Sequence, residues 1–268
     1  MNLFEKVLYF FQGEMERPVP FGWFHLLWLF LMSLCIVILC LNKNRSESKL
    51  NKILLTYGLI AFILELIKQL IWSFNYDSVN NIVTWDYQWY ASAFQLCTTP
   101  IYVSLIIPFI KNEKVKNALY SYLAYFTILG SLSVIFLPES CFVRTIEVNI
   151  HTMFLHYGSF VISMYLMISK KVSIKIKNVF EGFKVFLVFM CVALFLDVVI
   201  YNSGILNGET FNMFFISPYF ISTLPVYDVV QKSIPYIFYL LFYVVTVLIG
   251  GLIIYGIRVV VKKIFKIK

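Results

Sequence analysis

The sequence predicts an all-α, polytopic membrane protein with seven transmembrane helices. Of its 268 residues, 60% are hydrophobic and 13% are charged, whereas a soluble domain carries about 25% charged residues. So few charges cannot cover a water-facing surface, which excludes a cytosolic enzyme, a disordered chain and a nucleic-acid-binding domain. The aromatic fraction of 19% agrees with this, because Trp and Tyr gather where a membrane meets water.

Seven apolar stretches are long enough for a helix that crosses a hydrocarbon core about 30 Å thick, which takes about 20 residues. They lie near 20–41, 53–75, 91–110, 117–137, 147–169, 179–201 and 234–257. Each is predicted as a helix, because lipid offers the backbone no other hydrogen-bonding partner. We expect residues 20–268 to form a single transmembrane domain.

The first 19 residues are predicted to form an amphipathic helix that lies along the membrane interface. Its apolar residues recur at helical spacing: Leu3, Phe4, Val7, Leu8 and Phe11. No basic region precedes them and no small-residue cleavage site follows, so a cleavable signal is not expected.

The basic residues predict the orientation of the chain. Sixteen of them fall on one side of the spans: Lys43, Arg45, Lys49, Lys52, Lys111, Lys114, Lys116, Lys170, Lys171, Lys175, Lys177, Arg258, Lys262, Lys263, Lys266 and Lys268. Four fall on the other side: Lys6, Arg17, Arg144 and Lys232. Because cytoplasmic loops carry the excess of Lys and Arg, we expect an extracytoplasmic N-terminus, a cytoplasmic C-terminus and a multi-pass location in the cell membrane. The net charge of +8 is therefore a topology signal, not a sign of a nucleic-acid partner.

The connection from about 202 to 233, on the outer side, is too apolar to sit in water. It contains the run FNMFFISPYFISTLPVY and is interrupted by Pro218 and Pro225. Structureless loops of this length are uncommon. One interpretation is a re-entrant or interfacial lid that covers the outer end of the transmembrane helices, and the other is a connector that follows the protein surface.

Polar side chains inside the spans are costly, so they are the candidates for a functional site. They come from five helices: His25, Glu65, Lys68, Gln69, Gln95, Cys97, His151, His156, Asp197 and Asn202. At 1.5 Å per residue, Cys97 lies about 10 Å and His156 about 14 Å below the outer surface. The set therefore predicts one polar cavity in the outer half of the membrane.

Cysteine and histidine together predict nucleophilic chemistry in this cavity. A thiol reacts as the thiolate, and a nearby imidazole can take its proton. Depth favours His156 over His151 as the partner of Cys97, and Pro100 is expected to loosen the helix beside the thiol. The alternatives are that Cys97 is a small core hydrophobe and that Glu65 and Lys68 only pair to stabilise the bundle. With no CxxC or HExxH pattern, no metal and no cofactor are expected.

Several short motifs resemble the YwaF-like integral membrane proteins over residues 20–257. They are Phe24-His25, Glu65, FQLCTTP at 94–100, HTMFLHYG at 151–158, and the stretch from Asn202 through Leu206-Asn207-Gly208. That family is related to the transmembrane-protein-164 acyltransferases. The resemblance implies a membrane-embedded acyl-transfer site, with Cys97 as nucleophile and His156 as base. Two features depart from the family pattern, Gln95 in place of a histidine and the Phe-rich run in place of a Gly-Pro-rich one.

The leading functional hypothesis is a membrane-embedded acyltransferase or lipid hydrolase that works through a thioester on Cys97. Its partners are expected to be a membrane lipid or an acylated substrate. The remaining polar residues would orient the catalytic pair or bind the substrate: His25, Glu65, Lys68, Gln69, Gln95, His151, Asp197 and Asn202. The alternative is a transporter or solute-binding module that uses the same cavity, and a third option is a scaffold whose buried charges merely pair.

Overall fold

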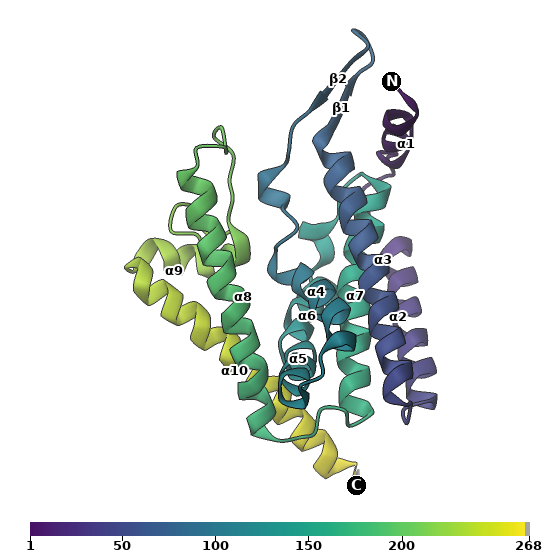
Figure 1. The fold of residues 1–268 in the computed structure, drawn as a ribbon, viewed down its shortest axis with the longest axis vertical. Coiled ribbons are helices and arrows are strands. Elements are labelled where there is room, and N and C mark those ends of the chain that lie inside the picture. Colours follow the sequence, from purple (N-terminus) through teal and green to yellow (C-terminus); the bar gives the residue numbers. More distant parts are fainter. Residues whose placement is uncertain (266–268) are drawn as a thin grey trace.

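The computed structural model describes residues 1–265 and is mostly helical (Figure 1). The helices are α1 (Leu3–Phe11), α2 (Trp23–Leu41), α3 (Glu47–Ser73), α4 (Thr99–Ile106), α5 (Glu113–Tyr125), α6 (Thr127–Phe136), α7 (Ile146–Ile168), α8 (Ile176–Asn202), α9 (Tyr227–Ser233) and α10 (Tyr236–Ile264). Short 3₁₀ helices are η1 (Trp89–Ala91), η2 (Leu96–Thr98), η3 (Ile107–Phe109), η4 (Pro138–Cys141) and η5 (Met213–Phe215). One antiparallel hairpin, β1 (Phe74–Asp77) and β2 (Ile82–Trp85), extends beyond α3.

Six helical segments within residues 1–265 are long and apolar enough to cross a membrane, and the chain is therefore a multi-pass membrane protein. They are Trp23–Leu41, Glu47–Ser73, Trp89–Phe109, Glu113–Phe136, Ile176–Asn202 and Tyr236–Ile264. The span expected at 147–169 coincides with α7, which is not among the six. Helix α7 packs against α2, α3, α5 and α6, so it can carry more polar residues than a lipid-facing helix. The count of seven spans and the orientation of the termini stay predictions.

The span expected at 91–110 is not one continuous helix. Residues 89–98 form two 3₁₀ turns, and the α-helix begins only at Thr99, with Pro100 in its first turn. Proline suits this position because it has no N–H and its φ matches a helix start. The prediction that Pro100 loosens a continuous helix beside Cys97 is therefore wrong, because only the 3₁₀ turn η2 precedes it and the α-helix starts at Thr99. The Leu96 carbonyl accepts a hydrogen bond from the Thr99 hydroxyl at 2.7 Å.

Helices α5 and α8 pack closely along much of their lengths. The contact depends on Gly182 in α8, where an added Cβ would lie 2.8 Å from backbone atoms of Ser121 and Tyr122. Small residues permit such backbone approach between helices in lipid. The contact fixes α8 against the centre of the bundle, where α5 also meets α7.

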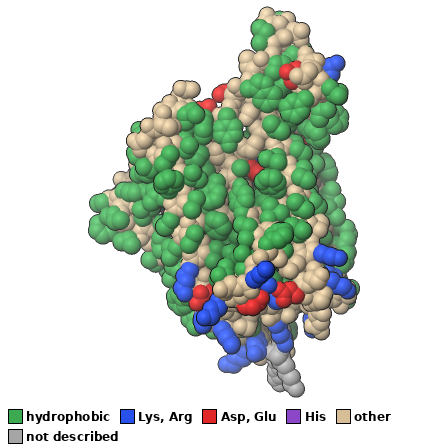
Figure 2. All heavy atoms as spheres, in the orientation of Figure 1, with side chains coloured by type: hydrophobic (Ala, Val, Ile, Leu, Met, Phe, Trp, Pro, Cys, Tyr) green, Lys and Arg blue, Asp and Glu red, His purple; other side chains and the backbone are tan. Residues whose placement is uncertain are grey.

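Lys and Arg side chains gather at the end of the molecule where the C-terminus lies, and we call this the basic end (Figure 2). There Lys116 forms ion pairs with Glu47 at 2.7 Å and with Glu113 at 3.0 Å. The opposite end carries α1 and the hairpin (Figure 1). Lys266 and Lys268, which contributed to the predicted orientation, lie outside the described residues.

The connection between α8 and α10 is partly buried. Residues 211–217, which we call the aromatic segment, include the fully buried Met213, Phe214, Ile216 and Ser217. They belong to the large hydrophobic cluster of the bundle rather than to its surface. The segment is followed by α9, and together they lie beside α8 and the start of α10 (Figure 1).

Candidate functional site

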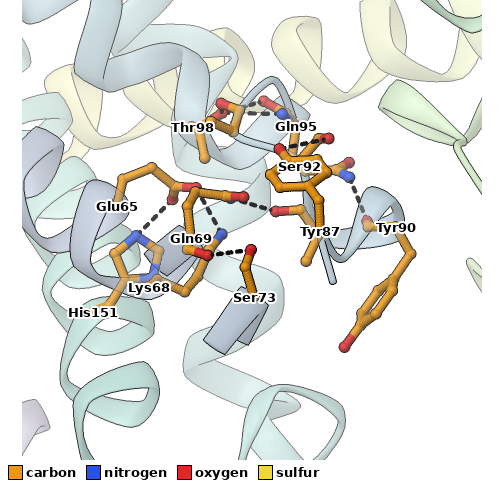
Figure 3. Close-up of polar contacts among 12 residues, drawn as sticks. Glu65, Lys68, Gln69, Ser73, Tyr87, Tyr90, Ser92, Gln95, Thr98 and His151 are labelled. Atoms are coloured by element: carbon orange, nitrogen blue, oxygen red, sulfur yellow. Dashed lines mark hydrogen bonds and ion pairs between the residues drawn. The ribbon is translucent and has the colours of Figure 1, made fainter. Parts of the chain in front are cut away.

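The centre of the candidate site is an ion-paired cluster between α3 and α7 (Figure 3). Glu65, 1% exposed, contacts Lys68 Nζ at 2.7 Å through Oε1 and His151 Nε2 at 2.9 Å through Oε2. Spacing on α3 puts Glu65 and Lys68 three residues apart on one face. Helix α7 supplies His151 from the facing side. A buried carboxylate is tolerable only with such partners, because an unpaired charge there is costly.

Gln69 ties this cluster to the chain before α4. Its side-chain amide donates to Glu65 Oε1 and to the Ala91 carbonyl, both at 2.7 Å. The Ser73 hydroxyl in turn donates to the Gln69 carbonyl at 2.7 Å. These bonds link α3 to the 3₁₀ turn η1, so the segment that leads to Cys97 is held against the carboxylate.

Side-chain hydrogen bonds also shape the turn that carries Cys97. The Thr98 hydroxyl donates to the Ala93 carbonyl at 2.7 Å and accepts from the Gln95 N–H at 3.0 Å. Gln95 donates to the Tyr90 carbonyl at 3.0 Å and not to the Glu65 cluster. Cys97 therefore lies in a fixed 3₁₀ turn directly before the N-terminus of α4.

The thiol of Cys97 lies between the ion-paired cluster and a group of phenols. Turn η2 packs against α6 and α7, and Lys68 and Glu65 are near enough for their charges to act on the thiol. Three tyrosines from different helices are also near the Cys97 thiol: Tyr57, Tyr102 and Tyr122.

The two histidines of α7 have different surroundings. The Nε2 atom of His151 contacts Glu65, and its buried Nδ1 has no hydrogen-bond partner among the described residues. His156 is in hydrogen-bonding contact with the backbone of Gly130 in α6. The geometry thus gives His151 an orienting carboxylate and a free ring nitrogen, whereas His156 bonds to a neighbouring helix.

Three further candidates lie away from the Glu65 cluster. His25, in α2, accepts a hydrogen bond at Nδ1 from the N–H of Phe21 at 2.9 Å, and its ring packs against Phe142 and Tyr157. Asp197 accepts from the Met213 N–H at 2.7 Å, and Asn202 donates to the Val198 carbonyl at 2.7 Å. The structure therefore brings together only part of the expected set, because the other side chains serve local backbone groups.

Comparison with known families identifies the chain. The model of the TMEM164 family matches residues 20–255. The chain belongs to the TMEM164 family. The narrower YwaF-like grouping stays a prediction. Neither a curated protein nor a solved structure gave a match.

One residue at the candidate site of this TMEM164 family member, Glu147, was not among the site residues that the sequence predicted. Glu147, in the first turn of α7, is 6% exposed, and neither of its carboxyl oxygens has a hydrogen-bond partner among the described residues. It lies one turn before His151, and the charges of Lys68 and Glu65 act on it. The available signal was the four-residue spacing between Glu147 and His151, which places both on one helix face.

Proposed function

We propose that this TMEM164 family member is an acyltransferase or lipid hydrolase that forms a thioester on Cys97. The observation that carries the proposal is the 2.9 Å contact between Glu65 and His151, because the charge of Glu65 is also near enough to act on the Cys97 thiol. A nucleophile, a base and a carboxylate that orients the base form the arrangement of nucleophilic acyl transfer. The resemblance of the sequence to acyltransferases supports the same reaction class.

In the first half-reaction, the imidazole takes the thiol proton and the thiolate attacks the ester carbonyl of a lipid. A C–S bond forms, and the carbonyl electrons move onto oxygen. Amides at the N-terminus of α4 and the Lys68 ammonium are the groups close to Cys97 that can stabilise this oxyanion. The C–O bond then breaks, and the imidazolium returns its proton to the leaving alcohol.

In the second half-reaction, an acceptor hydroxyl or water attacks the thioester. The imidazole removes the proton of the attacking group, and the C–S bond breaks to release the thiolate, which regains a proton from the imidazolium. Transfer and hydrolysis differ only in the identity of this acceptor. Glu65 stabilises the imidazolium in both halves through its contact with Nε2.

The base we favour is His151, although depth along the sequence favoured His156. The Glu65 carboxylate lies 2.9 Å from Nε2, and Nδ1 has no hydrogen-bond partner among the described residues, so it is available to accept a proton. His156 has no acidic partner among the described contacts and bonds to a backbone group of α6. Gln69 and Lys68 are proposed to hold Glu65 in place, whereas His25, Asp197 and Asn202 are proposed to support the surrounding structure.

The proposed site lies in the outer half of the cell membrane, with the basic end in the cytoplasm. Cys97, Glu65 and His151 are then reached from the outer leaflet, where phospholipid or acylated protein is the substrate. Neither a cofactor nor a metal takes part in the proposed steps, and no nucleic acid is a partner.

The direct test is lipid turnover by the purified protein in phospholipid vesicles whose acyl chains carry an isotope label. We expect the parental protein to transfer label to an added lysophospholipid or to release labelled fatty acid. Cys97→Ala should abolish both, whereas Cys191→Ala, at an exposed position on α8, should leave them unchanged. Turnover by Cys97→Ala at the parental rate would contradict the proposal.

A proton-coupled transporter is the second candidate, and the cluster of buried titratable groups favours it. Lys68, Glu65, His151 and Glu147 are neighbours near the end of α3 and the start of α7, and buried titratable groups of this kind form the proton relays of transporters. Proteoliposomes distinguish the two functions. A proton flux that survives Cys97→Ala and is lost in Glu65→Gln would favour transport.

A further inference from the structure

The aromatic segment, residues 211–217, contains the only two adjacent non-glycine residues with positive φ among residues 1–265. Phe214 (φ 56°) and Phe215 (φ 61°) are adjacent, and both lie in the left-handed region. That region is unfavourable for bulky residues because Cβ crowds the backbone. Strained residues of this kind persist only where the surroundings hold them, and they cluster at ligand clamps and switches.

Several polar contacts hold the segment, and three of them come from α8 and α10. Asp197, fully buried in α8, accepts from the Met213 N–H at 2.7 Å, and its other carboxyl oxygen has no hydrogen-bond partner among the described residues. Tyr239 in α10 donates to the Phe215 carbonyl at 2.6 Å, and Tyr236 donates to the next carbonyl at 2.6 Å. The segment is thus fixed by side chains of α8 and α10 and by aromatic packing.

The ring of Phe214 reaches the surroundings of the proposed nucleophile. It stacks on Phe94 with ring centroids 5.9 Å apart and also lies against Phe186 at 6.4 Å. Phe94 precedes Cys97 by three residues, and both border the hydrophobic cluster that contains Phe214. Phe94 therefore connects the turn that carries Cys97 to the ring of Phe214.

We propose that the space filled by the Phe214 ring is the binding site for the acyl chain of the substrate. This inference rests on the proposed function, because the chain is the one attached to Cys97 as a thioester. The chain extends past Phe94 and displaces the aromatic segment, which then moves outward and loses the contact between Asp197 and the Met213 N–H. Relief of the left-handed backbone at Phe214 and Phe215 offsets part of the cost of this displacement.

The test compares two alkylating probes that differ only in chain length, N-hexadecyl chloroacetamide and N-butyl chloroacetamide. In each case the Cys97 thiolate displaces chloride, so that a C–S bond forms, the C–Cl bond breaks, and the thiol proton passes to the base. Rates at Cys97 are measured on the full chain in detergent, by mass spectrometry of the peptide that contains Cys97, because the other four cysteines are also free thiols. The quantity of interest is the ratio of the hexadecyl rate to the butyl rate.

Phe214→Ala opens the proposed site before any chain arrives, so it should raise this ratio on the order of tenfold. The matched control is Phe195→Ala, a phenylalanine on α8 that is 65% exposed, and it should leave the ratio unchanged. An unchanged ratio in a folded Phe214→Ala protein overturns the acyl-chain site. If Cys97 reacts with neither probe in the parental protein, the proposed function fails and the acyl-chain site fails with it.

A second measurement uses the parental protein and does not depend on how a variant folds. Hydrogen exchange is followed at the amides of residues 211–217 before and after Cys97 is labelled. We expect the hexadecyl adduct to increase exchange there, because the Asp197 contact to Met213 is broken, and the butyl adduct to leave it unchanged. Equal protection of the amides of residues 211–217 in both adducts overturns the proposed displacement, even when Cys97 reacts with the probes and lipid turnover depends on Cys97.

Discussion

Replacement of Glu65 alone should lower the free energy of unfolding far more than replacement of Glu65 together with Lys68. Glu65 is almost wholly buried, and its carboxylate has Lys68 at 2.7 Å and His151 at 2.9 Å. Glu65→Leu leaves a buried ammonium without a counter-ion, which costs about 3–5 kcal/mol of unfolding free energy. In the Glu65→Leu/Lys68→Met protein both charges are gone, so the loss should shrink to about 1 kcal/mol or less.

The assay is the free energy of unfolding from a denaturing-detergent titration in mixed micelles, carried out as a double-mutant cycle. The chain offers a control pair with the same spacing, Glu181 and Lys184 on α8, which are 3.1 Å apart but much less buried, with side chains 26% and 67% exposed. Removal of either control residue should change the unfolding free energy by about 1 kcal/mol or less. If Glu65→Leu costs no more than the control, or if the double variant loses the sum of the single losses, the buried-pair reasoning is refuted.

Three further outcomes follow from the site and its packing. His151→Gln should slow alkylation of Cys97 by about 10²–10⁴-fold, whereas His156→Gln should slow it by less than about tenfold. The reverse order would show that His156 is the base. Glu147→Leu should raise the free energy of unfolding by about 1–3 kcal/mol, because it removes buried carboxyl oxygens without partners; a loss of stability in thermal unfolding would reveal a partner. Gly182→Val should lower the free energy of unfolding by about 1–3 kcal/mol or more, because its Cβ meets the α5 backbone, whereas Gly256→Ala, with open space around it, should change it little.

The sequence predicted a helical membrane protein because apolar stretches of about 20 residues leave the backbone few alternatives. The segment at 91–110 is apolar enough to span, although it is the least apolar of the six candidate segments among residues 1–265, but its backbone is not one continuous helix. Side-chain bonds of Thr98 and Gln95 compete with helix formation there, and Pro100 fits the start of a helix better than its middle. Hydropathy averages do not contain that information. They also rank α7 below the other spans, because its neighbours are helices rather than lipid.

For the site, spacing indicated which side chains share a helix face, and Glu65 and Lys68 are in contact. Depth along a helix did not decide between His151 and His156, because five residues rotate the side chain by about 140° and the partner helix is unknown from sequence. Nor did polarity distinguish Asp197, which caps the aromatic segment, from residues that face Cys97. Roles of this kind depend on contacts between residues far apart in the chain.

The central claim is that Cys97 carries an acyl group during turnover. The most direct measurement is intact mass spectrometry of the parental protein after brief incubation with a phospholipid that bears a heavy-isotope acyl chain. The account predicts an adduct with the mass of that chain, located on Cys97 and released by neutral hydroxylamine, which cleaves thioesters. Absence of an adduct while labelled lipid is turned over, or an adduct that persists in Cys97→Ala, would contradict it.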